Sequence, residues 1–119
     1  MDDQQYIRDS ACQFIAHFGY VAVSASNGTE AIALYTEALH SDEPFDAVVL
    51  ALTIEKGMGG AEAFRRLRSI NPGVIGLIYS DNAADPLITH YADYGFKGAI
   101  AKPFKLEVLQ EMLEKIIPM

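Results

Sequence analysis

The chain has little of what marks secreted, membrane-spanning or nucleic-acid-binding proteins. It holds one cysteine, Cys12, and no tryptophan among its 119 residues. A single cysteine cannot form an internal disulfide, which favours a reducing compartment such as the cytoplasm. No apolar run approaches the ~20 residues that a membrane helix needs, and the acidic start Met1-Asp2-Asp3 is unlike a signal peptide. We therefore expect a cytoplasmic protein with no membrane contact.

Positive charge is also scarce. Nine Lys and Arg stand against sixteen Asp and Glu, which gives a net charge of -7. Nucleic acids and anionic membranes select surfaces rich in Lys and Arg, so neither is expected as a partner. Half of the residues are hydrophobic, which is enough for a buried core. Its length is typical of one domain, here 1–119.

Hydrophobic periodicity predicts alternating helices and strands. The expected helices are 4–18, one from Thr29 to the polar break at 41–44, 61–70, 85–95 and 105–117, and the expected strands are 20–25, 45–52, 74–80 and 98–101. Alternation at this spacing predicts an α/β fold whose parallel sheet is covered by helices on both faces. Ligands in such folds gather at the carboxyl ends of the strands.

One such strand end raises a question about chemistry. Residues 45–60, FDAVVLALTIEKGMGG, read as a buried strand that leads into a glycine-rich loop. The residue at the strand end, Ala51, carries only a methyl group. The loop lacks the Gly-x-x-x-x-Gly-Lys-Ser/Thr pattern of a phosphate-binding loop, so its glycines alone do not predict one.

Four stretches together carry a family resemblance. They are MDDQQYIRD (1–9), NGTEAI (27–32), the stretch 45–60 and YGFKGAIAKPF (94–104). In these stretches the chain resembles the receiver domain of two-component response regulators, most of all the receivers at the C-terminal end of hybrid sensor histidine kinases. The resemblance spans nearly the whole chain and implies a flavodoxin-like, doubly wound parallel sheet with strand order 2-1-3-4-5.

The resemblance also implies a site for phosphoryl transfer to an aspartate beside Mg²⁺. Asp2, Asp3 and the Thr53 carbonyl match the positions that hold the metal, which prefers such oxygen ligands. Lys102 matches the lysine that neutralises the phosphoryl group. The hydroxyl residue that contacts the phosphoryl group falls on Tyr79, and a shift of one residue would place Ser80 there.

The phosphoacceptor itself falls on Ala51, and a methyl group cannot accept a phosphoryl group. Asp46 lies ~16 Å away at ~3.3 Å per residue, and neither Glu55 nor Asp81 is in register. We therefore expect a degenerate receiver, a pseudo-receiver that binds proteins and is not an enzyme. The alternative is a phosphoacceptor receiver with Mg-dependent Asp phosphorylation, in which Ala51 is an engineered substitution.

The residual site and the partner face remain to be assigned. Asp2, Asp3 and Lys102 are interpreted either as an internal salt bridge that closes the end of the sheet or as a weak Mg²⁺ site. The resemblance implies a partner face, which is matched here by Tyr91, Tyr94, Ala99 and Phe104. The partner it implies is a histidine kinase or another signalling domain.

One element of the family is missing. Receivers have a strand before the acidic pair, in the middle of the sheet, whereas this sequence begins at Met1. A missing central strand leaves unpaired backbone groups, which are costly when buried. The sheet is then four-stranded and rearranged, or completed by a second molecule in a homo-oligomer, or the sequence is a fragment.

Overall fold

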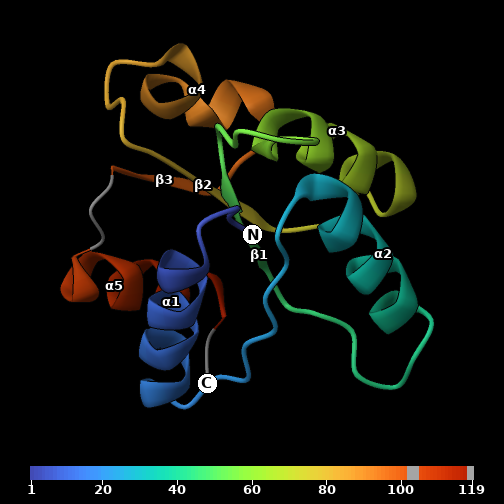
Figure 1. Cartoon of the computed structure of the whole chain (residues 1–119). Coiled ribbons are helices and arrows are strands. Elements are labelled where there is room, and N and C mark those ends of the chain that lie inside the picture. The colour runs from blue at the N-terminus through green and yellow to red at the C-terminus, as the bar shows by residue number, and fades with distance from the viewer. Residues whose placement is uncertain (102–104, 118–119) are drawn as a thin grey trace.

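The computed structural model describes residues 1–101 and 105–117, and Figure 1 shows their arrangement. The helices are α1 (Gln5–His17), α2 (Gly28–Leu39), α3 (Gly60–Ile70), α4 (Pro86–Thr89), the 3-10 helix η1 (Tyr91–Tyr94) and α5 (Leu106–Ile116), and the strands are β1 (Val48–Ala51), β2 (Gly76–Ser80) and β3 (Gly98–Ala101). Within these residues no helix is both long and apolar enough to cross a membrane.

The sheet of the described residues has three parallel strands in the order β1-β2-β3. All five residues of the central strand, β2, are buried. The register places Ala51 opposite Tyr79, and Tyr79 opposite Ile100. The carboxyl ends of the three strands therefore meet at one edge of the sheet.

Apolar clusters cover both faces of the sheet, which confirms the predicted doubly wound α/β architecture. On one face Leu50 and Ile78 pack with Phe64 of α3. On the other face Ala51 and Leu77 pack with residues of α5, among them Leu109. Neighbouring residues of one strand point to opposite faces, so the continuous apolar strands serve both cores.

The predicted strand at 20–25 was wrong, and the described sheet is not four-stranded. The structure assigns no strand there, and Val21 and Val23 are 92% and 55% exposed. Its carboxyl end is tied to the rest by one hydrogen bond, from the Asp2 amide to the Ala25 carbonyl at 3.0 Å. A strand needs a hydrogen-bonded neighbour along its length, and among the described residues the sheet assigns none to this segment.

The other differences concern element ends. The predicted helix 85–95 divides into α4 and η1, because His90 has φ −120° and ψ 37° and leaves the helical region. The strands predicted at 45–52 and 74–80 are shorter in the structure, while 98–101 is confirmed. The Asp85 side chain accepts a hydrogen bond from the Leu87 amide and caps α4, as the Asp-Pro pair predicts.

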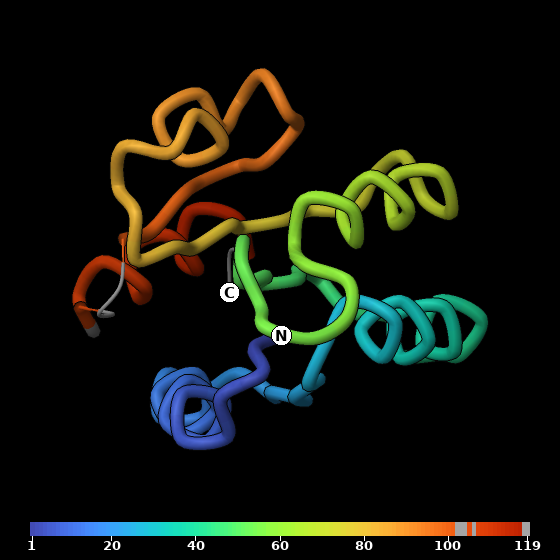
Figure 2. The backbone as a smooth tube through the Cα atoms, turned by 45° about the horizontal axis from the view of Figure 1, so that its top comes forward, coloured from blue at the N-terminus to red at the C-terminus, as the bar shows by residue number. Residues whose placement is uncertain are grey.

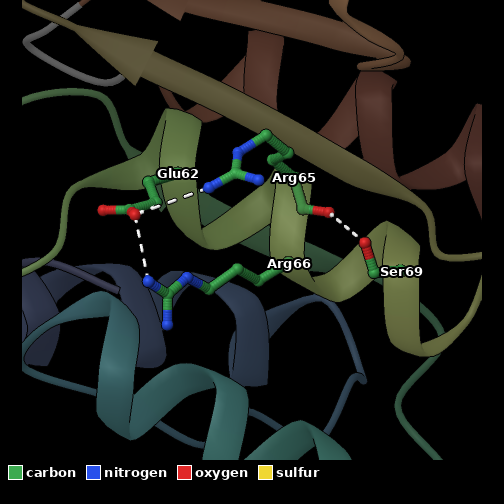
Figure 3. Close-up of polar contacts among 4 residues, drawn as sticks. All are labelled: Glu62, Arg65, Arg66 and Ser69. Carbon is green, nitrogen blue, oxygen red and sulfur yellow. Dashed lines mark hydrogen bonds and ion pairs between the residues drawn. The ribbon is translucent and has the colours of Figure 1, made fainter.

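The solvent-exposed face of α3 carries charged side chains that form ion pairs within the helix. Glu62 lies 3.5 Å from Arg65 and 3.1 Å from Arg66, and the Ser69 hydroxyl donates to the Arg65 carbonyl (Figure 3). All of these side chains come from one helix at spacings of three or four residues. Exposed pairs of this kind contribute little to stability. The fold is therefore held chiefly by the two apolar clusters.

Candidate functional site

Ala51 lies at the carboxyl end of β1, the place that the resemblance predicts for the phosphoacceptor, and its environment is apolar. The residue is 0% exposed and packs in the cluster that holds Leu77 and Ile100. Its amide donates to the Met1 carbonyl at 3.0 Å. The methyl group is thus part of the core.

Tyr79 fills the space beside Ala51 with its ring and its hydroxyl. The side chain is 3% exposed, and its hydroxyl donates to Asp2 Oδ2 at 2.8 Å and also lies 2.8 Å from the Met1 carbonyl oxygen. Burial raises the pKa of Tyr79 well above its ordinary value, and the hydrogen bond to Asp2 and the negative charges of Asp2 and Asp3 raise that pKa further. Arg8 opposes this shift. The phenol is therefore a neutral hydrogen-bond donor.

Asp2 is 1% exposed and is held by its own chain as well as by Tyr79. Its Oδ1 accepts from the Gln4 amide at 2.9 Å, which is a local turn at the start of α1. Its backbone carbonyl accepts from Arg8 Nη1 at 2.7 Å. Both carboxylate oxygens thus serve internal hydrogen bonds.

The remaining predicted site residues lie apart from this pair. Asp3 is half-buried, and its Oδ2 accepts from the Glu55 amide at 2.8 Å. Thr53 is exposed, and the Ser80 hydroxyl accepts from the Asn82 amide at 3.0 Å. Lys102 and Phe104 lie outside the described residues. The structure therefore brings Asp2 and Tyr79 together and directs Asp3 and Ser80 to the neighbouring loops.

These residues do not fit the magnesium site that the resemblance implies. Magnesium in proteins takes carboxylate and carbonyl oxygens. The third carboxylate position is Ala51, and the two oxygens of Asp2 already accept hydrogen bonds from the protein. Among the described residues no group of three or more His, Cys, Asp or Glu is placed to hold a metal ion.

The glycine-rich loop after β1 is explained by packing. Gly57 has φ +96°, in the left-handed region that glycine adopts without strain. A Cβ on Gly60 would meet the Ala51 carbonyl oxygen, so α3 begins directly against β1. The Gly28 amide donates to the Met58 carbonyl at 2.7 Å and fixes the loop to the start of α2.

The predicted partner face is only partly exposed. Tyr94 is 47% exposed, and its carbonyl accepts from Arg68 Nη1 at 3.3 Å. Tyr91 and Ala99 are half-buried and pack against the core that contains Phe96. Tyr94 is thus the exposed aromatic of the described part of this face.

A pocket of about 530 Å³ lies elsewhere, between the end of α3 and η1. Its lining includes Val74, before β2, and Lys97, before β3. It therefore opens near the amino ends of the strands, opposite the site around Ala51.

Sequence reasoning missed the groups that complete the Asp2 environment. They are the Met1 carbonyl, the Gln4 amide and the Arg8 side chain. A basic residue in the first helix, six positions after Asp2, is a signal that could have indicated Arg8. The Met1 carbonyl is a backbone group, and no side-chain pattern could indicate it.

Comparisons with known proteins agree with this architecture. Sporulation initiation phosphotransferase F of Bacillus subtilis (strain 168) is 27% identical over 119 residues, which are 100% of this chain and 91% of that protein. A response regulator receiver protein of Anaeromyxobacter sp. (strain Fw109-5) is 30% identical over 116 residues, which are 98% of this chain and 43% of that protein.

Solved structures share the fold. A CheX–CheY complex with BeF3 and Mg from Borrelia burgdorferi matches with a TM-score of 0.86 at 19% identity, over 99% of this chain and 86% of that chain. The receiver domain of a Pseudomonas aeruginosa PAO1 sensor histidine kinase, with magnesium in its active-site cleft, matches with a TM-score of 0.83 at 20% identity, over 100% and 94%.

The family model described as response regulator receiver domain matches residues 1–114. This match spans the two apolar clusters, the sheet and the residues around Ala51. The chain belongs to the response regulator receiver domain family of two-component signalling.

Proposed function

We propose that this receiver domain accepts no phosphoryl group and acts through protein–protein contacts. The observation that carries the proposal is the core position of Ala51, which is 0% exposed at the end of β1. The nucleophile of an aspartyl phosphorylation must be a carboxylate that the phosphodonor can reach. Ala51 supplies neither the carboxylate nor the access.

The Tyr79–Asp2 hydrogen bond supports the same proposal. In the family the corresponding hydroxyl contacts the phosphoryl group, whereas here the Tyr79 hydroxyl donates to Asp2 at 2.8 Å. A magnesium ion at Asp2, Asp3 and the Thr53 carbonyl would have to displace this hydrogen bond. We therefore propose that Mg²⁺ binds weakly.

The partner would be a histidine kinase or another signalling domain, and it would meet the side of the molecule that carries η1. Tyr94 supplies exposed aromatic surface there, which is typical of protein interfaces. The Borrelia neighbour was solved as a complex with another protein, and the Pseudomonas neighbour is the receiver of a kinase. Lys102 and Phe104 remain predictions for the same region.

Intact-protein mass after incubation with a small phosphodonor and Mg²⁺ tests the proposal. The unmodified chain, Ala51→Asp and the double variant Ala51→Asp/Tyr79→Thr are run side by side. We expect no acid-stable, base-labile adduct on the unmodified chain. An adduct there would overturn the proposal.

The two variants separate the proposal from the alternative of an engineered Ala51. If Ala51 alone silences an otherwise intact site, Ala51→Asp regains the adduct by itself. We expect instead that only the double variant forms the adduct, because the hydrogen bond from the Tyr79 hydroxyl engages the Asp2 carboxylate in the single variant as well. Circular dichroism of each variant before incubation shows that an unreactive variant is folded.

A further inference from the structure

The pocket of about 530 Å³ between the end of α3 and η1 lies away from the site around Ala51. Its helices, α3 and η1, lie on the same side of the sheet, whereas α1 lies on the other side (Figure 1 and Figure 2). Val74 and Phe96 belong to its lining and are 7% and 3% exposed, so they give the pocket an apolar base. The volume suits a small organic molecule and exceeds what an inorganic ion requires.

Two cations line the same pocket in an acidic molecule. Arg68, from the last turn of α3, and Lys97, directly before β3, are both exposed. No Asp or Glu is among the described residues of the lining, although the chain carries sixteen acidic and nine basic residues. The pocket therefore attracts anions locally, even though the net charge of the molecule is -7.

Within the described residues, neither of these two cations forms an ion pair with a carboxylate. Arg65 and Arg66, which lie on the same helix as Arg68, share Glu62 instead (Figure 3). A cation whose charge is already balanced by a neighbouring acid has less attraction left for a ligand. The charges of Arg68 and Lys97 can therefore both serve a bound anion.

The guanidinium of Arg68 is held in place by backbone groups of the pocket wall. Its Nη1 donates to the Tyr94 carbonyl at 3.3 Å. Gly95 leaves room for it, since a Cβ there would lie 2.8 Å from Arg68 Cζ. A guanidinium carries five N–H donors in a planar fork, and its remaining donors match the oxygens of an anionic group. Because the side chain is already positioned, it loses little conformational freedom when it binds an anion.

We propose that this pocket binds a small organic phosphate, in which an apolar group of about the size of an aromatic ring carries a phosphate dianion. The phosphate lies between Arg68 and Lys97, and its two negative charges match the two positive charges. The apolar group lies on Val74 and Phe96, where it displaces water from apolar surface. Binding does not require the residues around Ala51, because the pocket opens near the amino ends of the strands.

Phenyl phosphate is the probe, and it is titrated into the full chain without Mg²⁺ so that no metal-bridged site contributes. NMR follows the backbone amides of Gly73, Gly95 and Lys97 in the pocket, and those of Ala51 and Ser80 at the carboxyl ends of the strands. We expect saturable shifts of the pocket amides that fit one ligand per chain. The amides of Ala51 and Ser80 should not shift.

Three control ligands test the chemistry of the pocket. Inorganic phosphate lacks the apolar group, benzoate carries a single negative charge, and benzyl alcohol carries none. Each should bind roughly tenfold more weakly than phenyl phosphate, or weaker still, because each loses either the apolar contact or a charge-assisted contact.

Variants of the chain test the two cations. Arg68→Gln and Lys97→Gln should each weaken the binding of phenyl phosphate roughly tenfold, because each removes one charge-assisted contact. Arg66→Gln removes the same charge from the exposed face of the same helix and should leave the affinity nearly unchanged. Arg68→Gln also removes the hydrogen bond to the Tyr94 carbonyl, so Lys97→Gln is the variant that isolates the effect of charge. Amide spectra without the probe show that each variant is folded.

Three results would overturn the proposal. The first is no saturable shift of the pocket amides at millimolar phenyl phosphate. The second is a shift confined to Ala51 and Ser80, which would place the anion at the other end of the strands. The third is equal affinity of the Arg66→Gln and Lys97→Gln variants, or of a control ligand and phenyl phosphate, since either equality indicates attraction that does not use the pocket. The titration does not depend on phosphorylation, which the mass measurement tests separately.

Discussion

The hydroxyl of Tyr79 lies 2.8 Å from Oδ2 of Asp2, and this contact joins residues 77 positions apart in the chain. Both side chains are buried, at 3% and 1% exposed. Tyr79, near the carboxyl end of the central strand β2, thus donates a hydrogen bond to the carboxylate that matches a metal-binding position of the family. The contact should contribute to stability, which unfolding measurements can test.

Tyr79→Phe should destabilise the protein by about 1–3 kcal/mol, because a buried carboxylate oxygen of Asp2 loses its donor while the ring is kept. Urea unfolding followed by circular dichroism measures the change. Tyr94→Phe is the matched control, since Tyr94 is 47% exposed, and it should change stability by less than about 0.5 kcal/mol. Equal effects of the two substitutions would contradict the role assigned to Tyr79.

Stability should fall at alkaline pH through Tyr79. Its pKa is raised in the folded state, chiefly by burial, so the folded protein keeps a proton that the unfolded chain releases near pH ~10. The contribution of Tyr79 is present below about pH 10 and is lost as the pH rises toward the folded-state pKa, by up to about 1.4 kcal/mol per pH unit.

The measurement is the difference in unfolding free energy between the unmodified chain and Tyr79→Phe, taken between about pH 9 and 11. Other tyrosines and the lysines titrate in both proteins, so they largely cancel. The difference should shrink as the pH rises. A difference that stays constant across this range would show that Tyr79 ionises alike in the folded and unfolded states.

Gly60→Ala should destabilise the fold by about 1–3 kcal/mol, because the added methyl group meets the backbone carbonyl of Ala51, which cannot move without distorting β1. Thermal unfolding measures the effect. Gly73→Ala provides the comparison, since the nearest atom to its added methyl group is the exposed Asn71 Oδ1 at 3.4 Å. Gly73→Ala should leave the melting temperature nearly unchanged.

Asn27→Ala should lower the free energy of unfolding by about 1 kcal/mol, because it removes the N-terminal cap of α2. The Asn27 side chain accepts from the Glu30 amide at 2.9 Å. Asn27→Asp keeps a capping oxygen and should retain nearly full stability in the same urea titration. Equal losses for both variants would mean that the amide group of Asn27 matters for another reason.

The fold class and most elements were predicted correctly because the apolar residues recur at the spacing of a helix in some segments and form continuous runs in others. The continuous apolar run that contains Leu50 and the Asp85-Pro86 start of α4 are local signals, and both were confirmed. The segment 20–25 has the composition of a strand, yet strand formation depends on a neighbour. The composition of a segment does not show whether another strand lies beside it, and the prediction was wrong for this reason.

The place of Ala51 in the fold was predictable from the sequence, whereas the contacts of Tyr79 were not. Ala51 was located correctly at the carboxyl end of β1. Tyr79, with Ser80 as its alternative, was matched to the position that contacts the phosphoryl group, and the structure shows the Tyr79 hydroxyl beside Asp2 and the Met1 carbonyl. Such a reach depends on the register of three strands and on side-chain torsions, which spacing in the sequence does not determine.

The absence of buried residues from α1 gives the molecule uneven resistance to local unfolding. Opening of α1 should expose less apolar surface than opening of β2, since none of the thirteen residues of α1 is buried. Its amide protons should therefore exchange with solvent through brief openings of that helix alone. The amides of β2, whose five residues are all buried, should exchange only when the whole domain unfolds. A protease would accordingly cut α1 first and leave the core of the domain intact for longer.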